Sequence, residues 1–213
     1  MSPTLQEFLL WFPAVVIALT VHEFAHAYVA DRLGDPTARA LGRVTLNPLS
    51  HLDPVGTILL VVMHFGWGRP VPVDTRYLAN PKRDMLMIAA AGPAINVATA
   101  VVVGLSLRLA GSALRESDTG APIYLGLQAL VLLSLLLAFF NLLPIPPLDG
   151  SKVLMGLLPT PIANAYARRA SLLSWGLMGL IVMGAMTGWH PLSRLIFPPA
   201  RWLHALLTGA DLP

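Results

Sequence analysis

The chain has 213 residues, of which 55% are apolar and 12% are charged, and its mean hydropathy is +0.68. Soluble domains carry about twice that fraction of charge, so this composition excludes a disordered chain and argues against an ordinary soluble enzyme. The net charge of +3 comes from basic residues scattered between apolar segments, which argues against nucleic-acid binding. The absence of cysteine from the sequence excludes disulfides and cysteine metal sites.

Four segments are apolar enough and long enough to cross a bilayer, which requires about 20 mainly apolar residues. They cover residues 9–30, 85–107, 121–143 and 170–187. The third ends where a run of prolines begins at Pro144, because proline cannot continue a helix. The first lacks the basic start and the small-residue cleavage site of a signal peptide, so we expect it to remain as a span. This pattern predicts an all-α polytopic membrane protein with about four transmembrane helices.

Two further stretches are expected to lie in or on the membrane without crossing it. The apolar run at residues 55–65 is too short for a span, and residues 42–46 and 70–74 on either side of it have the character of short β-strands. We therefore predict that residues 38–80 form a re-entrant loop with short β-strands, covered by protein where it enters the bilayer. Residues 188–213 contain two arginines and several prolines, which predicts a broken interfacial helix.

The distribution of basic residues predicts the orientation of these spans. Lys and Arg concentrate in the loops at residues 31–84 and 144–170, whereas the connection between the second and third spans has two arginines offset by Glu116 and Asp118. Loops rich in Lys and Arg stay in the cytoplasm. We therefore expect a multi-pass protein of the cell membrane with an extracytoplasmic N-terminus, in which the end of the first span lies toward the cytoplasmic side.

The first predicted span carries an H-E-x-x-H motif, formed by His22, Glu23 and His26. Positions i and i+4 share a helix face, so both imidazoles can reach one metal ion. Glu23 is then beside the open coordination site, where a glutamate can take a proton from metal-bound water. Ionisable side chains in a membrane helix are costly unless they are paired or bind metal, which favours a functional site. The alternative is a polar cluster that only holds helices together, or a site that has lost its metal.

A catalytic zinc normally has three protein ligands and one open position, so another segment must supply a His, Asp or Glu. Asp149 is the leading candidate, because it follows a long uncharged stretch and prolines that force an extended break after the third span. Gly150 permits a close turn at this point. The alternative role for Asp149 is to cap the N-terminus of the helix that contains Lys152.

Together these motifs resemble those of the site-2 protease family of intramembrane zinc metalloproteases. The resemblance rests on the H-E-x-x-H motif of the first span and on the sequence NLLPIPPLDG at residues 141–150. Weaker matches lie at residues 46–56, 68–73 and 91–96. The resemblance covers roughly residues 5–155, and the chain is similar to the short members of the family that lack a PDZ or CBS domain.

The resemblance implies a single intramembrane metalloprotease domain over residues 1–213 that binds one Zn2+ per chain through His22, His26 and Asp149. It implies that Glu23 activates a zinc-bound water and that Asn141 helps to hold the substrate or the developing oxyanion. The re-entrant loop would present the substrate strand. The implied function is regulated intramembrane proteolysis, the hydrolysis of peptide bonds within or near transmembrane segments. Expected partners are the lipid bilayer and membrane-protein or signal-peptide-remnant substrates, with no nucleic acid.

Two other functions are compatible with a polar cluster in the membrane, a scaffold that sequesters client proteins and a metal or ion transporter. The intact Glu23 argues against a scaffold, which has no use for a general base, and the absence of an internal repeat in the sequence argues against a transporter. His51 is expected to have a structural role within a turn, and Asn96 to bond across helices. The remaining histidines, expected at the membrane interfaces, are His64, His190 and His204.

Overall fold

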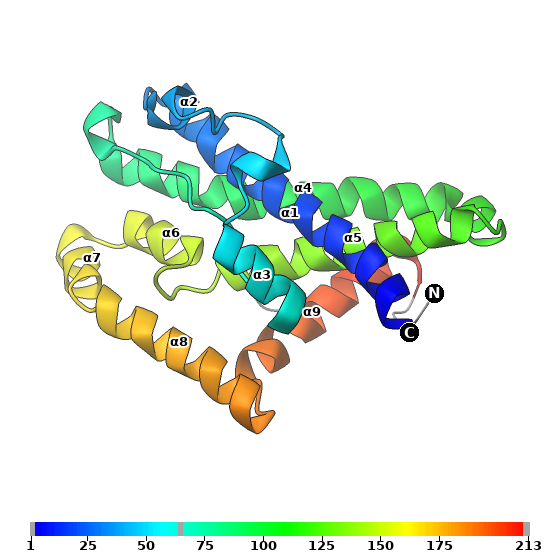
Figure 1. Ribbon diagram of the computed structural model, residues 1–213. Helices are drawn as coiled ribbons and strands as arrows, with labels where there is room; N and C mark the ends of the chain where they lie inside the picture. Colours follow the sequence, from blue (N-terminus) through cyan, green and yellow to red (C-terminus); the bar gives the residue numbers. More distant parts are fainter. Residues whose placement is uncertain (1–2, 64–65, 211–213) are drawn as a thin grey trace.

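A computed structural model describes residues 3–63 and 66–210 of the chain, and the regular structure in them is helical (Figure 1). Four of these helices are long and apolar enough to cross a membrane. They are α1 (Pro3–Arg32), α4 (Pro81–Arg115), α5 (Gly120–Asn141) and α8 (Ala170–Thr187). The four predicted spans are therefore confirmed as helices, and α4 extends beyond its predicted span at both ends. The protein is a multi-pass membrane protein.

Helices α1, α4 and α5 form the core bundle, and each of the three contacts the other two. α1 and α5 run in the same direction, and α4 runs against them (Figure 1). Ala14 and Ala18 of α1 are buried against Leu130 of α5. Such small side chains let helix backbones approach closely, as packing between helices in a bilayer requires. The segments that follow α1 and α5 and precede α4, which are rich in Lys and Arg, consequently share one end of the bundle.

The loop at residues 38–80 contains a short apolar helix, α3 (Pro54–Met63). Only brief helical turns accompany it, namely α2 (Thr37–Ala40), η1 (Pro48–Ser50) and η2 (Thr75–Tyr77). Among the described residues of this loop no strand forms, and the single β-type contact is an isolated antiparallel bridge between Leu52 and Gly68. Pro70 and Pro72 have no N–H to donate to a ladder. The short β-strands predicted on either side of α3 are therefore not found in this part of the chain.

Side chains hold this loop against the bundle in place of a β-ladder. The buried guanidinium of Arg43 donates to the carbonyl oxygens of Arg69 and Pro70, the latter at 3.2 Å. Asp35, buried after the end of α1, accepts from the backbone N–H of Asp74 at 2.7 Å. These contacts position the segment between Arg69 and Asp74 without pairing its backbone to another strand.

The chain turns back after α5 through α6 (Asp149–Leu157) and α7 (Thr160–Ala167) before it enters α8. α6 packs against α4, and Lys82 at the start of α4 donates to the carbonyl of Leu158 at the end of α6. α8 diverges from the bundle (Figure 1), and only 11% of the residues in its 18-residue apolar stretch are buried. Because α6 contacts α4, the turn after α5 places the start of α6 against the bundle.

The C-terminal segment differs from the broken helix that its prolines predict. α9 (Pro191–Thr208) is continuous through Pro198 and Pro199, and it packs against α4 and α5. Leu207 is buried in the apolar cluster that these helices share. Gly104 of α4 leaves room for it, since a Cβ on Gly104 would lie 2.8 Å from the Cβ of Leu207. The packing of α9 against α4 and α5 compensates for the helical hydrogen bonds that Pro198 and Pro199 cannot form.

Candidate metal centre

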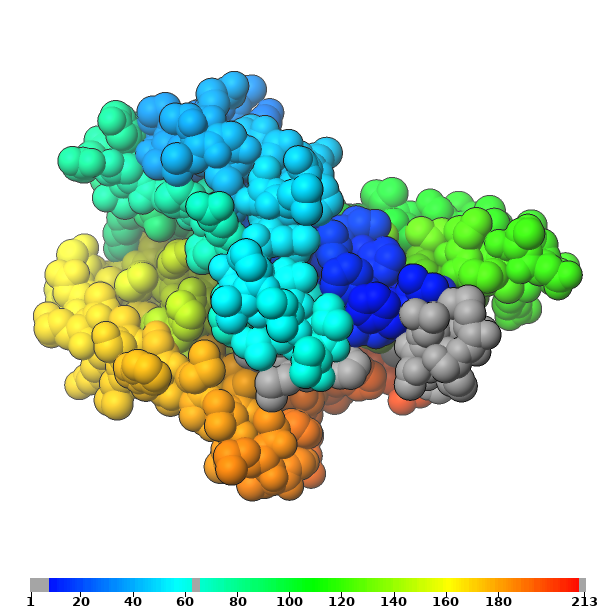
Figure 2. All heavy atoms as spheres, in the orientation of Figure 1, coloured from blue at the N-terminus to red at the C-terminus, as the bar shows by residue number. Residues whose placement is uncertain are grey.

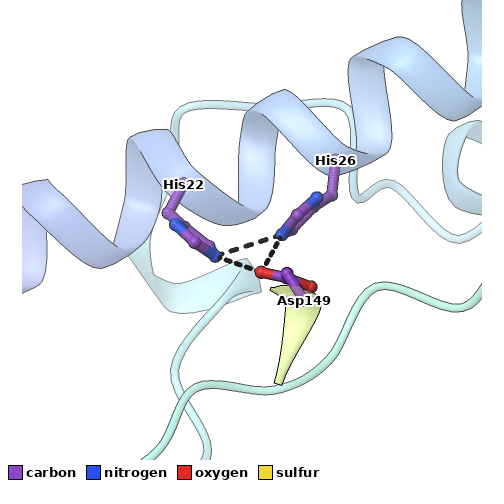
Figure 3. A group of neighbouring side chains, drawn as sticks. All are labelled: His22, His26 and Asp149. Atoms are coloured by element: carbon purple, nitrogen blue, oxygen red, sulfur yellow. Dashed lines mark hydrogen bonds and ion pairs between the residues drawn. The ribbon is translucent and has the colours of Figure 1, made fainter. Parts of the chain in front are cut away.

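Three side chains from two distant segments converge in the bundle (Figure 3). His22 and His26 lie one turn apart on α1, and their Nε2 atoms are 3.1 Å apart. Oδ2 of Asp149, at the start of α6, lies 3.1 Å from both Nε2 atoms. All three residues are buried. Within residues 3–63 and 66–210, they form the one group of His, Asp and Glu side chains close enough to share a metal ion.

Asp149 reaches this position because the chain between α5 and α6 doubles back tightly. A Cβ on Gly150 would lie 2.2 Å from the carbonyl oxygen of Leu142, so the close approach requires glycine. Asp149 is the first residue of α6, and its carboxylate oxygens face the histidines and Lys152 rather than the N–H groups of the helix. The predicted close turn is confirmed, and the alternative capping role of Asp149 is not observed.

The backbone of α4 orients one of the two imidazoles. Nδ1 of His26 donates to the carbonyl oxygen of Ile88 at 2.7 Å. Because a carbonyl can only accept, Nδ1 carries the proton and the lone pair of Nε2 is left for a metal. Nδ1 of His22 is buried and forms no well-aligned hydrogen bond among the described residues, although the backbone of Gly92 interacts with this imidazole. The ring of His26 is therefore held more firmly than that of His22.

Neighbouring groups balance the charge of Asp149. Its second oxygen, Oδ1, lies 3.6 Å from Nζ of Lys152, one turn along α6. Burial alone would raise the pKa of Asp149, but when no metal is bound, protonated Nε2 atoms of His22 and His26 can donate to its carboxylate, and these hydrogen bonds outweigh burial and hold the pKa well below its usual value. Asp149 is therefore ionised at neutral pH, as a metal-binding carboxylate must be.

Glu23 and Asn141 line a pocket of about 660 Å³ that also reaches the three converging side chains. This volume is typical of ligand sites, which measure about 300–1,000 Å³. The carboxylate of Glu23 forms no hydrogen bond or ion pair in the described part of the chain, so it is free to accept a proton. The amide of Asn141 donates to the carbonyl of Leu137 at 3.0 Å, which leaves a second N–H available. All five predicted site residues thus border one pocket.

Gly92 of α4 also faces this cluster, and the motif at residues 91–96 does not by itself reveal its role. A Cβ on Gly92 would lie 2.5 Å from Nε2 of His26 and 2.6 Å from Nε2 of His22. Any side chain here would therefore occupy the space beside both Nε2 atoms. The signal in the sequence is a glycine inside a helical pattern, which often marks the close approach of another group.

The other polar residues singled out in the sequence lie outside the cluster. His51 is buried and donates through Nε2 to the carbonyl of Thr45 at 2.7 Å, in agreement with a structural role, and burial lowers its pKa. The amide of Asn96 is buried without a hydrogen bond among the described residues, so the predicted bond across helices is not found. His204 is buried on α9 rather than exposed at an interface. His64 lies outside the described residues.

Comparisons with known proteins identify the family of the chain. The sequence profile of peptidase family M50 matches residues 119–184. A protein of Bacillus subtilis named "Putative zinc metalloprotease YwhC" is 39% identical over 173 residues, which cover 79% of this chain and 77% of YwhC. The chain belongs to peptidase family M50, the site-2 protease family. The predicted family is therefore confirmed.

More distant relatives carry similar names. Rip2 of Mycobacterium tuberculosis, which bears the same description as YwhC, is 31% identical over 82% of this chain and 67% of its own length. A zinc metalloprotease of Methanocaldococcus jannaschii is 28% identical over 69% of this chain and 34% of its own length. No solved structure is significantly similar to the chain.

The converging residues fit a zinc ion. Zinc ligands lie about 2.0–2.2 Å from the ion, so the ligand atoms of a tetrahedral site are roughly 3.3 Å apart. The three separations between Nε2 of His22, Nε2 of His26 and Oδ2 of Asp149 are each 3.1 Å. Two imidazoles and one carboxylate are a donor set of catalytic zinc sites, which keep a fourth position open. The missing Cβ of Gly92 leaves space beside the histidine nitrogens.

We expect His22→Ala to abolish zinc binding and Asp149→Asn to weaken it by more than about tenfold, because each change alters one of the three groups placed to hold the ion. Zinc per chain in detergent-purified protein measures both effects. His204→Ala is the matched control, since it removes a buried histidine outside the cluster and leaves zinc binding intact. Full retention of zinc by Asp149→Asn would remove Asp149 from the set of ligands.

We expect Gly92→Ala to lower zinc affinity by about tenfold or more, because the new methyl group crowds both histidine nitrogens. Zinc titration and thermal unfolding with and without zinc measure the loss. Gly104→Ala is the control on the same helix, since its methyl group crowds Leu207 and lies away from the cluster. A Gly92→Ala protein that binds zinc as tightly as the wild type would contradict the assignment of this space to the ion.

Proposed function

We propose that this chain is an intramembrane zinc endopeptidase that hydrolyses peptide bonds within or near transmembrane segments of other membrane proteins. The observation that carries the proposal is the environment of Glu23, a free carboxylate in a pocket beside three converging metal-binding groups. This pocket lies within a bundle of helices long enough to span a membrane. A metal site with an adjacent carboxylate base is the arrangement that metal-assisted hydrolysis needs.

The broader part of this function follows from the family. Peptidase family M50 consists of peptidases, and its relatives YwhC and Rip2 are named as zinc metalloproteases. The chain is therefore a zinc metalloprotease with Zn2+ as its cofactor, which favours the protease over the scaffold and the transporter. We further propose that His22, His26 and Asp149 hold one Zn2+ per chain.

The polar groups at the pocket can be given separate roles. When bound, zinc lowers the pKa of a coordinated water and polarises a carbonyl group. Glu23 takes a proton from the attacking water and then protonates the leaving amine, so it acts first as a general base and then as a general acid. Asn141 keeps one N–H free of Leu137 and can hold the substrate or the developing oxyanion.

The segment between Arg69 and Asp74 supports presentation of the substrate as an extended strand. Arg69 and Val71 each precede a proline and are therefore biased toward extended conformations. Val71 and Val73 line the pocket, and their backbone groups have no backbone partner in the described part of the chain. In an extended chain, alternate residues direct their N–H and C=O groups to the same side. A substrate segment unwound from its helix can therefore pair with this edge by β-augmentation.

Orientation and substrates complete the proposal. His22 and His26 lie in the half of α1 nearest to the loops rich in Lys and Arg, which favours an active site toward the cytoplasmic side and an extracytoplasmic N-terminus. α3 is apolar but too short to cross, which supports a re-entrant loop at residues 38–80 within a single domain of residues 1–213. The substrates are membrane proteins or remnants of signal peptides, cleaved by regulated intramembrane proteolysis.

Glu23→Gln is expected to lower the rate of cleavage by about 10²–10⁴-fold, because the amide cannot accept the proton of the attacking water. Zinc per chain should stay at the wild-type value, since Glu23 lies outside the group of metal-binding side chains. The assay is cleavage of a single-span reporter protein reconstituted with the enzyme in liposomes. Cleavage at the wild-type rate by the zinc-loaded variant would exclude Glu23 as the base.

Val71→Pro should lower kcat/KM for the same reporter by about three- to tenfold, because it removes one N–H that would pair with the substrate. Val71→Ala changes the side chain but keeps the N–H, so a smaller loss is expected from it. Zinc content and thermal unfolding of both variants test whether the fold survives. If the proline variant keeps its fold and cleaves as fast as the alanine variant, strand pairing at this position is wrong.

A further inference from the structure

The pocket beside Glu23 has two chemically different ends. α1 and α5 run in the same direction (Figure 1), and along both helices the apolar lining residues come before the polar ones. On α1, Val15 and Leu19 precede Glu23, and on α5, Leu133 precedes Asn141 by two turns. Because the helices are parallel, the apolar residues of both lie toward the same end of the pocket.

The apolar end of the pocket is a groove that we call the apolar arm. It is lined by Val15 and Leu19 of α1, Leu60 of α3, and Leu133, Leu136 and Leu137 of α5. Glu23 lies eight positions after Val15 on the helix, which corresponds to about 12 Å at 1.5 Å per residue. None of these six residues carries a polar side chain, so they offer no side-chain hydrogen bond to a polar group inside the arm. Trp67, in the loop that contains α3, also lines the pocket.

The arm is closed on one side by the loop that contains α3. Figure 2 shows α3 at the surface beside α1. Gly68 packs onto the arm from the same loop, since a Cβ on it would lie 3.0 Å from Cδ1 of Leu19. Leu60 and Gly68 therefore line the arm on the side of this loop, and the arm is continuous with the catalytic end of the pocket.

The opposite end of the pocket offers polar groups. Asn141 and Lys152 line it together with the unpaired backbone edge at Val71 and Val73. The side chain of Lys152 is 42% exposed, so a polar or acidic side chain can be accommodated beside it while remaining in contact with water. Met85, Ile88 and Ala89 of α4 also line the pocket, so the two ends differ in that only this one adds polar partners to an apolar lining.

We infer that the pocket selects a peptide bond at the boundary between an apolar run and a polar stretch of the substrate. This inference rests on the proposed function. The apolar arm takes the side chains of about three to four residues on one side of the scissile bond, since an extended chain advances about 3.3–3.6 Å per residue. A charged side chain in the arm would lose its hydration without gaining a partner, so such substrates are excluded. Residues on the other side of the bond lie at the polar end.

Peptide profiling tests this specificity directly. The zinc-loaded protein in detergent is incubated with a defined mixture of synthetic peptides, and mass spectrometry identifies the bonds that are cleaved. We expect large apolar residues to be enriched at consecutive positions on one side of the cleaved bond, with polar and acidic residues tolerated on the other. Introducing Asp at the apolar positions should lower kcat/KM by about 10²-fold.

A variant at the far end of the arm locates the preference in the structure. Val15→Trp fills that end, so it should lower kcat/KM about tenfold for peptides with Leu at the most distant apolar position and leave peptides with Ala there nearly unaffected. Ile17→Trp is the matched control, because Ile17 lies on the same helix, is exposed and does not line this pocket. Zinc content and thermal unfolding should be equal in both variants and the wild type.

The outcomes separate this inference from the proposed function. Cleavage that depends on Glu23 but has no apolar preference, or has one on both sides of the bond, would overturn the inference and leave the protease intact. An unchanged profile for Val15→Trp would also overturn it. If the zinc-loaded wild type cleaves no peptide in the mixture, and no single-span reporter in liposomes, the proposed function fails and the inference fails with it.

Discussion

The structure depends on the burial of ionisable groups inside an apolar bundle. His22, His26 and Asp149 are largely buried, so little water solvates them, and a carboxylate left unpaired in such surroundings is strongly destabilising. Their ligand atoms all face one space, so a single divalent cation can offset the burial of all three. A cation bound there would join α1 to α6, whose contributing residues His22 and Asp149 lie 127 positions apart in the chain.

Backbone groups and glycines make this convergence possible. Gly150 lets the chain fold back against Leu142, and Gly92 leaves the space beside the two Nε2 atoms empty of side chain. The carbonyl of Ile88 holds the ring of His26. The site therefore relies on close approach between helices rather than on additional polar side chains. Such an arrangement limits the free-energy cost of burial in a bilayer, because each further buried polar group would need a hydrogen-bonding partner of its own.

Features that depend on local spacing could be read from the chain before its fold was known. Apolar runs predict the four spans because hydropathy alone decides whether a helix suits a bilayer. His22 and His26 share a face because an α-helix has 3.6 residues per turn. Asp149 could be anticipated from chemistry, since an isolated charge after a long uncharged stretch needs a partner. The motifs around these residues then identify the family.

Contacts between distant segments emerge only from the folded chain. Nothing in α4 indicates that the carbonyl of Ile88 meets His26, which lies 62 positions away, or that Gly92 faces both histidines. The lack of strands beside α3 in the described residues also depends on a distant contact. Arg43 donates to the carbonyl oxygens of Arg69 and Pro70, which a β-ladder would otherwise use. α9 stays helical through Pro198 because of what it packs against. Local periodicity defines the conformation of one segment, whereas the distances between segments depend on packing of the whole chain.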